Sequence, residues 1–400
     1  MQKKLEFIIS HRLSGTLARA GVIKTPHGNI ETPAFIPVGT KATLKALTPE
    51  QLEATGAQAV LANAYHLFLR PGHDIIDGAG GLHTFMNWTG PTFTDSGGFQ
   101  VMSLGAGFKK VIDMTGKEPE ELSTKKDKLA HIDNDGVTFK SHLDGQMHRF
   151  TPEISMQIQH GIGADITFAF DELTTLYHDY NYQVESLDLR THPWAVRSLA
   201  EHQRLNAERT HRPPQALFGV VQGAHFEDLR RKSAKFLGAM DFDGFGLGGA
   251  LEKEKIGEIV RWMCEELPED KPRHMLGISE PDDIFACIEN GADTFDCVSP
   301  ARVGRNGALY TRNGRINIQR AEFRRDFRPF DETCDCYTCK NYSRAYLHHL
   351  FRAGELLSNT LGTIHNERFI VRLVDDIRES IKNDRFQEFK QQFLADYYKN

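Results

Sequence analysis

Short apolar or β-branched runs recur along the chain, and longer stretches with a helix-like mixture of polar and apolar residues separate them. Such an alternation is typical of a parallel sheet built from βα units. Eight runs of this kind occur, at residues 34–39, 59–64, 91–95, 165–171, 216–222, 242–249, 274–278 and 294–298. Because eight parallel strands close a barrel, the pattern predicts an α/β fold of the (β/α)8 TIM-barrel type.

Several of these runs finish on a polar residue or a glycine. Asp95, Asp171, Gln222 and Gly249 stand at the ends of four runs, and Asp296 lies near the end of the last. The C-terminal ends of barrel strands converge on one face, and that face holds the active site. We therefore expect these five residues to be neighbours in space.

Three regions depart from the βα rhythm. After Asp95 there is a lysine-rich insertion at about 105–131, followed by a string with strand character around Asp144 and Gly145 that predicts a hairpin. The first forty residues also look β-rich, with a turn at 26–28. The rhythm lapses again after Arg302, and we expect an amphipathic helix from Asn366 onward.

Composition restricts the class of protein. The chain has 400 residues, of which 40% are hydrophobic, enough for a large buried core and too many for a disordered or fibrous protein. The apolar run before His11 is shorter than a signal peptide or a membrane span requires. We therefore expect a cytoplasmic protein with no membrane partner.

The charge is unevenly distributed. The formal net charge of the chain is -6, which argues against bulk attraction to nucleic acid. Residues 302–352 nevertheless contain ten arginines and one lysine against five acidic residues. A solvated surface is one interpretation of this basic segment, and a nucleic-acid contact is the other.

Three of the six cysteines, Cys334, Cys336 and Cys339, lie within six residues in the basic segment. Thiolates this close suit one tetrahedral zinc ion better than disulfides. The spacing leaves the fourth ligand open among His348, His349 and His365. A site closed by four protein ligands has no place for substrate, so the ion is expected to be structural.

The other cysteines stand in apolar surroundings and are interpreted as core residues: Cys264, Cys287 and Cys297. Altogether, the sequence predicts one barrel domain over residues 1–400. Within it we expect a β-rich segment at 1–33 and a zinc-binding subdomain at about 302–365.

Two carboxylates are candidates for chemistry. Asp95 opens the string DSGGFQ, where it either caps a helix or stands at a barrel mouth beside glycines that let a ligand approach. Asp296 lies in an otherwise apolar strand, where the alternatives are a structural salt bridge and a catalytic role. Together they would allow one acid to attack an anomeric carbon while the other protonates the leaving group.

The string GFGLGG has Gly244, Gly246 and Gly249 at the spacing of a dinucleotide-binding motif. These glycines lie inside a strand pattern and do not open the turn after one, which disfavours a Rossmann fold. Exposure of backbone to a flat ligand at Gly249 is the preferred interpretation.

Taken together, these motifs resemble the bacterial tRNA-guanine transglycosylases over nearly the whole chain. The resemblance rests on DSGGFQVMSL, VTFKSHLDG, FDE, VVQG, GLGG, FDCV, GRNG, the CxCxxC cluster and RAYLHHL followed by HN. It implies a barrel enzyme that exchanges guanine at the wobble position of tRNA for a 7-deazaguanine base. By resemblance, Asp296 is the nucleophile that bonds covalently to the ribose, and Asp95 is the general acid and base.

The resemblance also implies how the base is bound. Asp171, Gln222 and the backbone of Gly249 and Ala250 match positions that recognise the base, with Ser96 nearby. Phe99 and Leu276 match the two residues that sandwich it. This agrees with the physical requirement of a flat base for apolar faces and polar edges.

For the C-terminal part, the resemblance implies one zinc ion held by Cys334, Cys336, Cys339 and His365, and RNA contacts from Arg302 and Arg305. Family members commonly form homodimers. Three residues match an aromatic cluster at that interface: Tyr342, where tryptophan is familiar, Tyr346 and His349.

Other positions depart from the family pattern. Ala301 and Ser299 are unusual beside the RNA-contacting arginines, and GGALEKE replaces the familiar GGLAVGE at the pocket for the side group of the base. The preferred base, either the aminomethyl precursor or queuine, therefore stays open. The alternative function is a non-catalytic tRNA-binding subunit, against which the two retained carboxylates argue.

Overall fold

The computed structural model describes residues 4–105 and 130–399. Within them, eight parallel strands form one sheet in the order β4-β14-β13-β12-β11-β10-β6-β5. Its edges meet through a parallel bridge between Val38 and Leu61, so the sheet closes into the expected barrel. The strands are β4 (Ala34–Pro37), β5 (Val60–Ala62), β6 (Thr92–Thr94), β10 (Ile166–Phe168), β11 (Ala216–Val221), β12 (Gly244–Leu247), β13 (Arg273–Met275) and β14 (Thr294–Cys297). Each lies within or overlaps one of the eight runs read from the sequence.

Large rings from non-adjacent strands fill the barrel interior. Phe93 of β6 lies 5.4 Å from the ring of His274 in β13, and Phe168 of β10 lies 5.3 Å from the same ring. The glycines of β12 make room for such rings, because a Cβ on Gly244 would lie 2.5 Å from Phe218. This packing explains the glycines of GFGLGG that resembled a dinucleotide motif.

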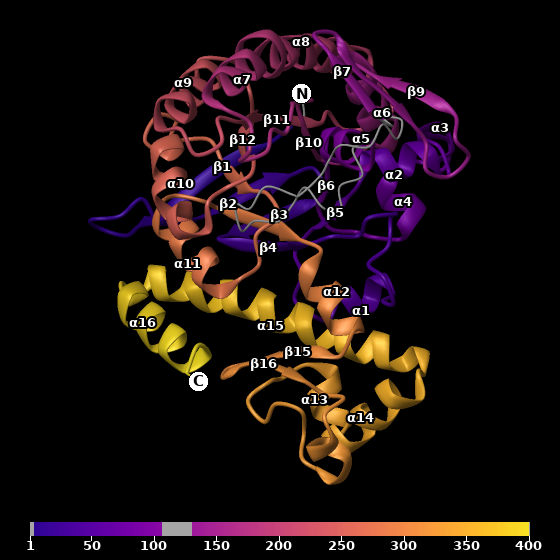
Figure 1. Ribbon diagram of the computed structural model, residues 1–400, viewed down its shortest axis with the longest axis vertical. Helices are drawn as coiled ribbons and strands as arrows, with labels where there is room; N and C mark the ends of the chain where they lie inside the picture. The colour runs from indigo at the N-terminus through magenta and orange to yellow at the C-terminus, as the bar shows by residue number, and fades with distance from the viewer. Residues whose placement is uncertain (1–3, 106–129, 400) are drawn as a thin grey trace.

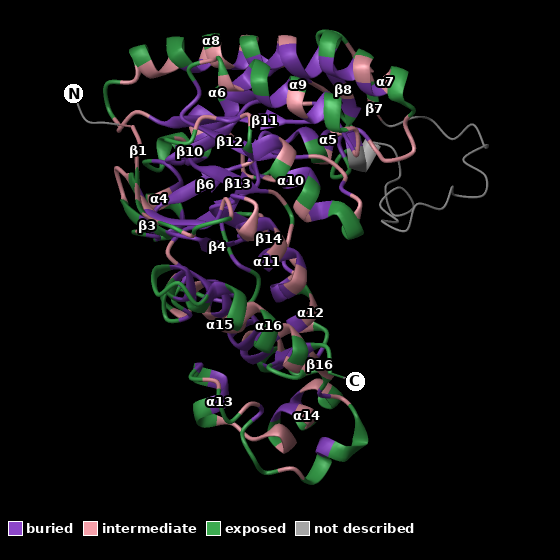
Figure 2. Ribbon diagram, turned by 90° about the vertical axis from the view of Figure 1, so that its left-hand side faces the viewer, coloured by how far each residue is buried: buried purple, intermediate pink, exposed green. Residues whose placement is uncertain are grey.

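Helices cover the outside of the barrel with one apolar face each (Figures 1 and 2). In Figure 2, α8 shows this as an alternation of buried and exposed turns. The helices before the C-terminal part are α1 (Pro49–Glu53), α2 (Ala64–Leu69), α3 (His73–Gly78), α4 (Leu82–Met86), α5 (Gly98–Gly105), α6 (Pro152–Ile162), α7 (Tyr180–Glu185), the π-helix η2 (Ser186–Thr191), α8 (His192–Glu208), α9 (Glu227–Gly238), η3 (Lys253–Lys255), α10 (Ile256–Cys264) and α11 (Pro281–Glu289).

Two small antiparallel sheets flank the barrel. At the N-terminus β1 (Glu6–Arg12), β2 (Arg19–Thr25) and β3 (Gly28–Thr32) form one sheet, with the turn at the expected position. The hairpin expected around Asp144 and Gly145 is β8 (Gly136–Lys140) paired with β9 (Met147–Phe150), and β7 (Ala130–Asp133) adds a third strand. Most of the lysine-rich insertion, residues 106–129, lies outside the described residues.

From residue 308 onward, the basic segment folds into short elements that lie beyond the long helix α15 (Leu356–Lys382) from the barrel strands (Figure 1). After β14 the chain forms α12 (Ser299–Arg305), β15 (Ala308–Thr311), β16 (Gly314–Asn317), η4 (Ala321–Arg325), α13 (Tyr337–Asn341) and α14 (Arg344–Ala353). It then returns along the barrel as α15 (Leu356–Lys382) and ends with α16 (Phe386–Tyr397).

Helix α15 begins at Leu356, ten residues before the start that we expected at Asn366. Its first two residues, Leu356 and Leu357, are exposed, but burial begins at Ser358 and the helix packs against α12, so tertiary packing supports the helix before Asn366. At the crossing, a Cβ on Gly304 of α12 would lie 2.7 Å from the carbonyl oxygen of Gly362 in α15. The two backbones therefore touch through glycines. No helix in the described part of the chain is long and apolar enough to cross a membrane.

Candidate functional site

Asp95 and Asp296 both stand at the C-terminal end of the barrel strands. Asp95 directly follows β6, and Asp296 is the third residue of β14, three strands away around the barrel. They are near enough for the negative charge of Asp296 to help raise the pKa of Asp95. The mouth thus holds the two carboxylates that the strand ends predicted.

Asp296 sits among hydrogen-bond donors. Its Oδ1 lies 3.1 Å from His274 Nε2 and 3.2 Å from the backbone nitrogen of Gly277. The other ring nitrogen of His274 lies 2.9 Å from Thr294 Oγ1, which fixes the imidazole against β14. The side chain of Asp296 remains 14% exposed, so a substrate can reach it. A salt bridge, the structural alternative for Asp296, would form here only with a protonated His274. The contact with His274 also fixes the orientation of the carboxylate.

Asp95 is held by the start of a different helix from the one that follows it. Its Oδ1 accepts from the backbone N–H of Ala64 at 2.8 Å, and its Oδ2 accepts from the side chains of Asn63 and, at 3.2 Å, Gln100. Ser96 is the residue that accepts the N–H of Gly98 at the beginning of α5. The two sequence interpretations therefore do not exclude each other, because Asp95 accepts a backbone N–H at the start of α2 while it stands at the end of a barrel strand.

The pKa of Asp95 is raised to about 7, chiefly by removal of the carboxyl group from water and also by the charge of Asp296, while the hydrogen bond from Ala64 opposes the rise. A carboxyl group with a pKa near neutrality is present in both its protonated and its ionised form under physiological conditions. It can therefore serve as both acid and base.

Asp171, Ser96 and Gln222 form a connected group at the mouth. Gln222 Nε2 donates to Asp171 Oδ2 at 2.7 Å, and Ser96 Oγ lies 3.5 Å from Asp171 Oδ1. Gln222 Oε1 is buried and has no hydrogen-bond partner in the described chain. Burial raises the pKa of Asp171 to about 6. Such a row of oriented donors and acceptors suits the edge of a heterocyclic base.

The remaining residues expected at the base lie on opposite sides of the mouth. Phe99 is in the first turn of α5, after β6, and 42% of it is exposed. Leu276 directly follows β13, which stands diametrically opposite β6 in the strand order. Gly249 and Ala250 follow β12 and are partly buried. Each of these residues thus lies on a segment that follows a barrel strand.

Arg302 and Arg305, expected to contact RNA, lie on α12 immediately after the nucleophile candidate. Arg302 is exposed, and Arg305 is partly buried. Burial lowers the pKa of Arg305, and the neighbouring charge of Arg302 lowers it further. Within residues 4–105 and 130–399, neither arginine forms an ion pair with a carboxylate at 4.0 Å or less, although the charge of Glu367 acts on Arg305.

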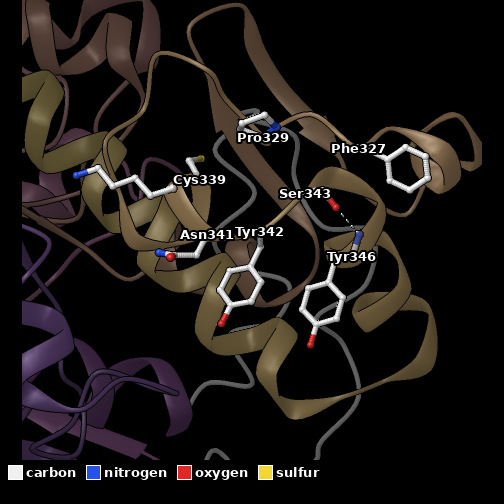
Figure 3. Close-up of a pocket in the computed structure, with 8 residues that line it drawn as sticks. Phe327, Pro329, Cys339, Asn341, Tyr342, Ser343 and Tyr346 are labelled. Atoms are coloured by element: carbon white, nitrogen blue, oxygen red, sulfur yellow. Dashed lines mark hydrogen bonds between the residues drawn. The ribbon is translucent and has the colours of Figure 1, made fainter.

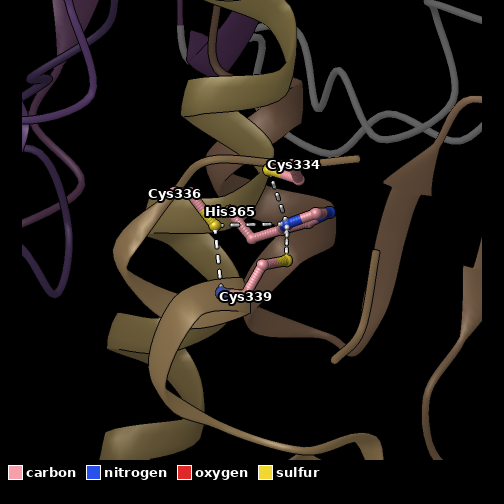
Figure 4. Close-up of side chains that lie close together, drawn as sticks. All are labelled: Cys334, Cys336, Cys339 and His365. Atoms are coloured by element: carbon pink, nitrogen blue, oxygen red, sulfur yellow. Dashed lines mark hydrogen bonds between the residues drawn. The ribbon is translucent and has the colours of Figure 1, made fainter. Parts of the chain in front are cut away.

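The three clustered cysteines surround one histidine nitrogen (Figure 4). His365 Nδ1 lies 3.7 Å from Cys334 Sγ, 3.5 Å from Cys336 Sγ and 3.3 Å from Cys339 Sγ. Neighbouring ligands of a tetrahedral zinc ion stand about 3.6 Å apart, given Zn–S and Zn–N bonds of about 2.3 and 2.0 Å. The spacing therefore fits a zinc ion at the centre of the four side chains, and the group is one that could hold a metal.

The choice among the three candidate histidines is settled by position. His365 Nε2 lies 2.6 Å from the carbonyl oxygen of Tyr310, which leaves Nδ1 to face the sulfur atoms. His348 instead contacts the carbonyl of Ile318, and His349 lies beside the ring of Tyr346. The fourth ligand comes from α15, so the metal would fasten the basic segment to a helix of the barrel.

A second group of possible ligands has the wrong spacing for a metal. His27 Nδ1 lies 2.6 Å from Asp165 Oδ1, and His83 Nε2 lies 3.1 Å from Asp165 Oδ2. These are hydrogen-bond distances, and the two imidazole rings stack at 3.6 Å instead of pointing their lone pairs at one centre. The group links the N-terminal sheet to the barrel at the start of β10.

Sequence reasoning missed the residues that hold the two carboxylates. His274, Asn63 and Gln100 were not identified as site residues, and all three contact Asp95 or Asp296. One signal was present in the sequence, because His274 interrupts an apolar strand two positions before Leu276. The contacts of Asn63 and Gln100 depend on how neighbouring strand ends meet.

Comparison with known proteins agrees with this geometry. A family model described as queuine tRNA-ribosyltransferase matches residues 14–399. The chain is 47% identical over 388 residues to the queuine tRNA-ribosyltransferase of Caldanaerobacter subterraneus subsp. tengcongensis, covering 96% of each chain. It is 48% identical over 387 residues to that of Thermoanaerobacter pseudethanolicus, covering 96% of this chain and 95% of the relative. Against that of a Roseiflexus species it is 46% identical over 401 residues, covering 98% and 99%. These matches cover nearly the full length of a chain that has two carboxylates at its barrel mouth and a Cys3His cluster. The chain therefore belongs to the queuine tRNA-ribosyltransferase family.

Proposed function

We propose that the protein is a tRNA-guanine transglycosylase, which exchanges guanine at the wobble position of tRNA for a 7-deazaguanine base during queuosine modification. The observation that carries this proposal is the pair Asp95 and Asp296, which share one mouth but stand in different surroundings. A pair of carboxylates with different environments suits a reaction that needs a nucleophile and a separate proton donor.

The first half of the reaction forms a covalent intermediate. An oxygen of Asp296 attacks C1′ of the ribose, and the bond from C1′ to N9 of guanine breaks with its electron pair passing to the base. Protonated Asp95 gives its proton to the departing guanine. The N–H of Gly277 and the ring of His274 hold the attacking carboxylate in place.

The second half reverses these roles. The ionised Asp95 takes the proton from N9 of the incoming 7-deazaguanine base, and that nitrogen attacks C1′. The ester bond to Asp296 breaks, its electrons return to the carboxylate, and the modified RNA is released. A pKa of about 7 for Asp95 suits both the donation and the acceptance of this proton.

The base would lie between Phe99 and Leu276, with its polar edge toward Asp171, Gln222 and the backbone of Gly249. The opposite placement of β6 and β13 supports the sandwich, and the row from Ser96 through Asp171 to Gln222 supports the edge contacts. Ala250 would border the side group of the base. Competition between the aminomethyl precursor and queuine in one exchange assay decides which base is preferred.

For RNA binding, we propose that residues 302–365 form a zinc-binding subdomain on a single barrel domain of residues 1–400, with residues 1–33 as a β-rich segment. One structural zinc ion would be held by Cys334, Cys336, Cys339 and His365, and the fit of their spacing supports it. Arg302 and Arg305 would contact the tRNA backbone. A tRNA substrate supports a cytoplasmic location.

We also propose a homodimer through the surface of the zinc segment shown in Figure 3. The rings of Tyr342 and Tyr346 stack at 5.4 Å beside a hollow of about 570 Å³. Phe327 at its edge is 79% exposed. Exposed aromatic side chains grouped around a concave surface are typical of protein interfaces. The self-association expected from Tyr342, Tyr346 and His349 has physical support here.

Exchange of labelled guanine tests the proposed reaction. Incubation of the zinc-loaded protein with unmodified tRNA and labelled guanine should transfer label to the wobble nucleotide. A tRNA with another base at that position is the control and should stay unlabelled. Binding of tRNA without any exchange would overturn the proposal in favour of a non-catalytic tRNA-binding subunit.

A further inference from the structure

Arg230 is a fully buried arginine in α9 with no acidic partner. Its side chain is 0% exposed, and burial alone lowers its pKa, to about 9. No carboxylate of the described chain forms an ion pair with it. Because burial of an unpaired charge is costly, a guanidinium in such a place must be held by strong hydrogen bonds to fixed dipoles.

Those dipoles belong to the two loops that carry the proposed base site. Arg230 Nη1 donates to the carbonyl oxygen of Gly248 at 2.6 Å and to that of Val221 at 3.2 Å. Val221 directly precedes Gln222, and Gly248 directly precedes Gly249. One guanidinium therefore ties together the C-terminal ends of β11 and β12 from behind the mouth.

A third hydrogen bond fixes the turn after β11. Arg230 Nε donates to the carbonyl oxygen of Ala224 at 2.7 Å. Ala224 has a φ of 49°, a conformation that a residue with a side chain seldom adopts. The arginine thus stabilises a turn that is unfavourable by itself, two residues beyond Gln222.

The bond to Gly248 determines the direction of the next amide. In a planar trans peptide the C=O and the following N–H point in opposite directions, and the peptide between Gly248 and Gly249 is trans. Since the carbonyl faces Arg230, the N–H of Gly249 points away from the guanidinium. A cation on the carbonyl also polarises the peptide and strengthens its N–H as a donor.

No side chain would fit at Gly249. A Cβ there would lie 2.7 Å from Arg230 Nη2 and 2.7 Å from Gln222 Oε1, and the φ of Gly249 is +96°. Arg230 and Gln222 therefore fill the space into which a side chain at position 249 would project.

We propose that Arg230 is a positioning residue for base recognition, which fixes and polarises the Gly248–Gly249 peptide so that the Gly249 N–H binds the carbonyl oxygen of the purine-type base. The same hydrogen bond strengthens as the base gains negative charge on leaving the ribose. Arg230 acts through Gly249 and does not touch the base. This inference rests on the proposed base exchange.

A role in the donor strength of Gly249 predicts selective effects that a packing role does not. Guanine has the carbonyl oxygen, whereas 2-aminopurine lacks it. Arg230→Met should weaken binding of guanine by about tenfold or more, the loss expected for about 1.4 kcal/mol of hydrogen bonding, while binding of 2-aminopurine changes much less. The ratio of the two dissociation constants, measured by calorimetry, is the readout.

Two further variants complete the experiment. Arg230→Lys can still donate to one carbonyl and should recover part of the preference for guanine. If Arg230→Met does not fold, Arg230→Lys decides the question. A preference for guanine over 2-aminopurine that is weaker than in the wild-type protein supports the proposal, and a preference equal to that of the wild-type protein overturns it. Arg231→Met is the matched control, because Arg231 forms ion pairs with Glu227 and Glu265 at the surface and should leave the ratio unchanged.

An equal loss of affinity for both bases in Arg230→Met, or no loss for either, would overturn the inference. That result would leave the proposed function intact as long as the wild-type protein exchanges guanine. Absence of exchange by the wild-type protein would instead overturn the proposed function itself.

Discussion

At the scale of single residues, the two carboxylates differ in what surrounds them. Asp296 is approached by the N–H of Gly277 and the ring of His274, whereas burial and the charge of Asp296 act to keep Asp95 protonated. This contrast supports the proposed division of roles, with Asp296 as the nucleophile and Asp95 as the proton donor. In the sequence this assignment came only from the family resemblance, because strand patterns alone do not show what surrounds each carboxylate.

The raised pKa of Asp95 predicts a pH dependence. Release of guanine needs protonated Asp95, and the protonated fraction falls as the pH rises through about 7. The single-turnover rate of guanine release should therefore decrease between pH 6 and pH 8.5, measured by rapid quenching with labelled tRNA. A rate that is flat or rises over this interval would contradict the role of Asp95 as the acid. Asp95→Asn should remove most of the rate together with its pH dependence.

His274 illustrates which site residues sequence reasoning can find. Its position in an apolar strand was visible, but its contact with Asp296 depends on the register between β13 and β14. Asn63 and Asp95 meet because β5 and β6 are paired in parallel, so that their ends coincide. Contacts of this kind follow from strand pairing, which a local pattern does not specify.

At the scale of elements, the barrel strands were the most predictable feature. Strands with helices on one side and a packed interior on the other are continuously apolar, and such runs are easily recognised. The start of α15 was predicted ten residues too late, because LLSNTLGTIH mixes polar and small residues. Those small residues are needed where α15 crosses α12, so the tertiary contact explains the composition.

This crossing predicts the effect of one methyl group. A Cβ on Gly362 would lie 2.5 Å from the carbonyl oxygen of Gly304. Gly362→Ala should force the helices apart, lower the free energy of unfolding by about 1–3 kcal/mol, and weaken tRNA binding more than base binding, since α12 carries Arg302. Denaturant unfolding and tRNA binding assays measure the two effects.

Gly78→Ala is a suitable control for that variant. Gly78 lies in α3, and a Cβ there would meet nothing within 4 Å. Gly78→Ala should leave the free energy of unfolding unchanged or raise it slightly, because alanine is more favourable than glycine in a helix. Equal stability of the Gly362→Ala and Gly78→Ala proteins would contradict this prediction, because it would show that α12 and α15 can separate without loss of stability.

The zinc cluster predicts the consequence of metal removal. A zinc ion bound by the three cysteines and His365 would connect the loop around Cys334 to α15, and this connection is lost when the ion is removed. Chelation should remove one zinc ion per chain, lower the thermal midpoint and make the segment between Cys334 and His365 sensitive to protease. Metal analysis and limited proteolysis follow these changes.

Cys264→Ala serves as the matched control for metal loss. Cys264 is buried in the barrel core away from the cluster, so the variant should keep its zinc. Cys339→Ser should lose it. A Cys339→Ser protein that retains one zinc ion per chain, with unchanged thermal stability, would disprove the assignment of the ligands.

At the scale of the whole molecule, the chain places base chemistry and RNA binding on adjacent parts. Asp296 is followed at once by α12, and α15 packs against both α12 and the zinc segment. Arg302 and Arg305, the proposed RNA contacts, thus stand on a helix that begins beside Asp296. The sequence predicted both parts, but it could not show that a single long helix joins them.

The proposed dimer predicts a change in oligomeric state. Tyr346 is 39% exposed and stacks on Tyr342 at the hollow of Figure 3. Tyr346→Ala should shift the protein toward monomer in sedimentation or light scattering at micromolar concentration, because a buried aromatic contact is lost. Tyr180→Ala, at an exposed tyrosine on α7, should leave the mass unchanged. A wild-type protein that is monomeric at these concentrations would refute the dimer.

The central claim is that Asp296 forms a covalent bond to the ribose of the wobble nucleotide. The most direct test is to quench the protein with unmodified tRNA by denaturation, digest the adduct and locate the attached nucleotide by mass spectrometry. The account predicts attachment at Asp296, and its absence in Asp296→Asn. An adduct on another residue, or one that persists in Asp296→Asn, would contradict the account.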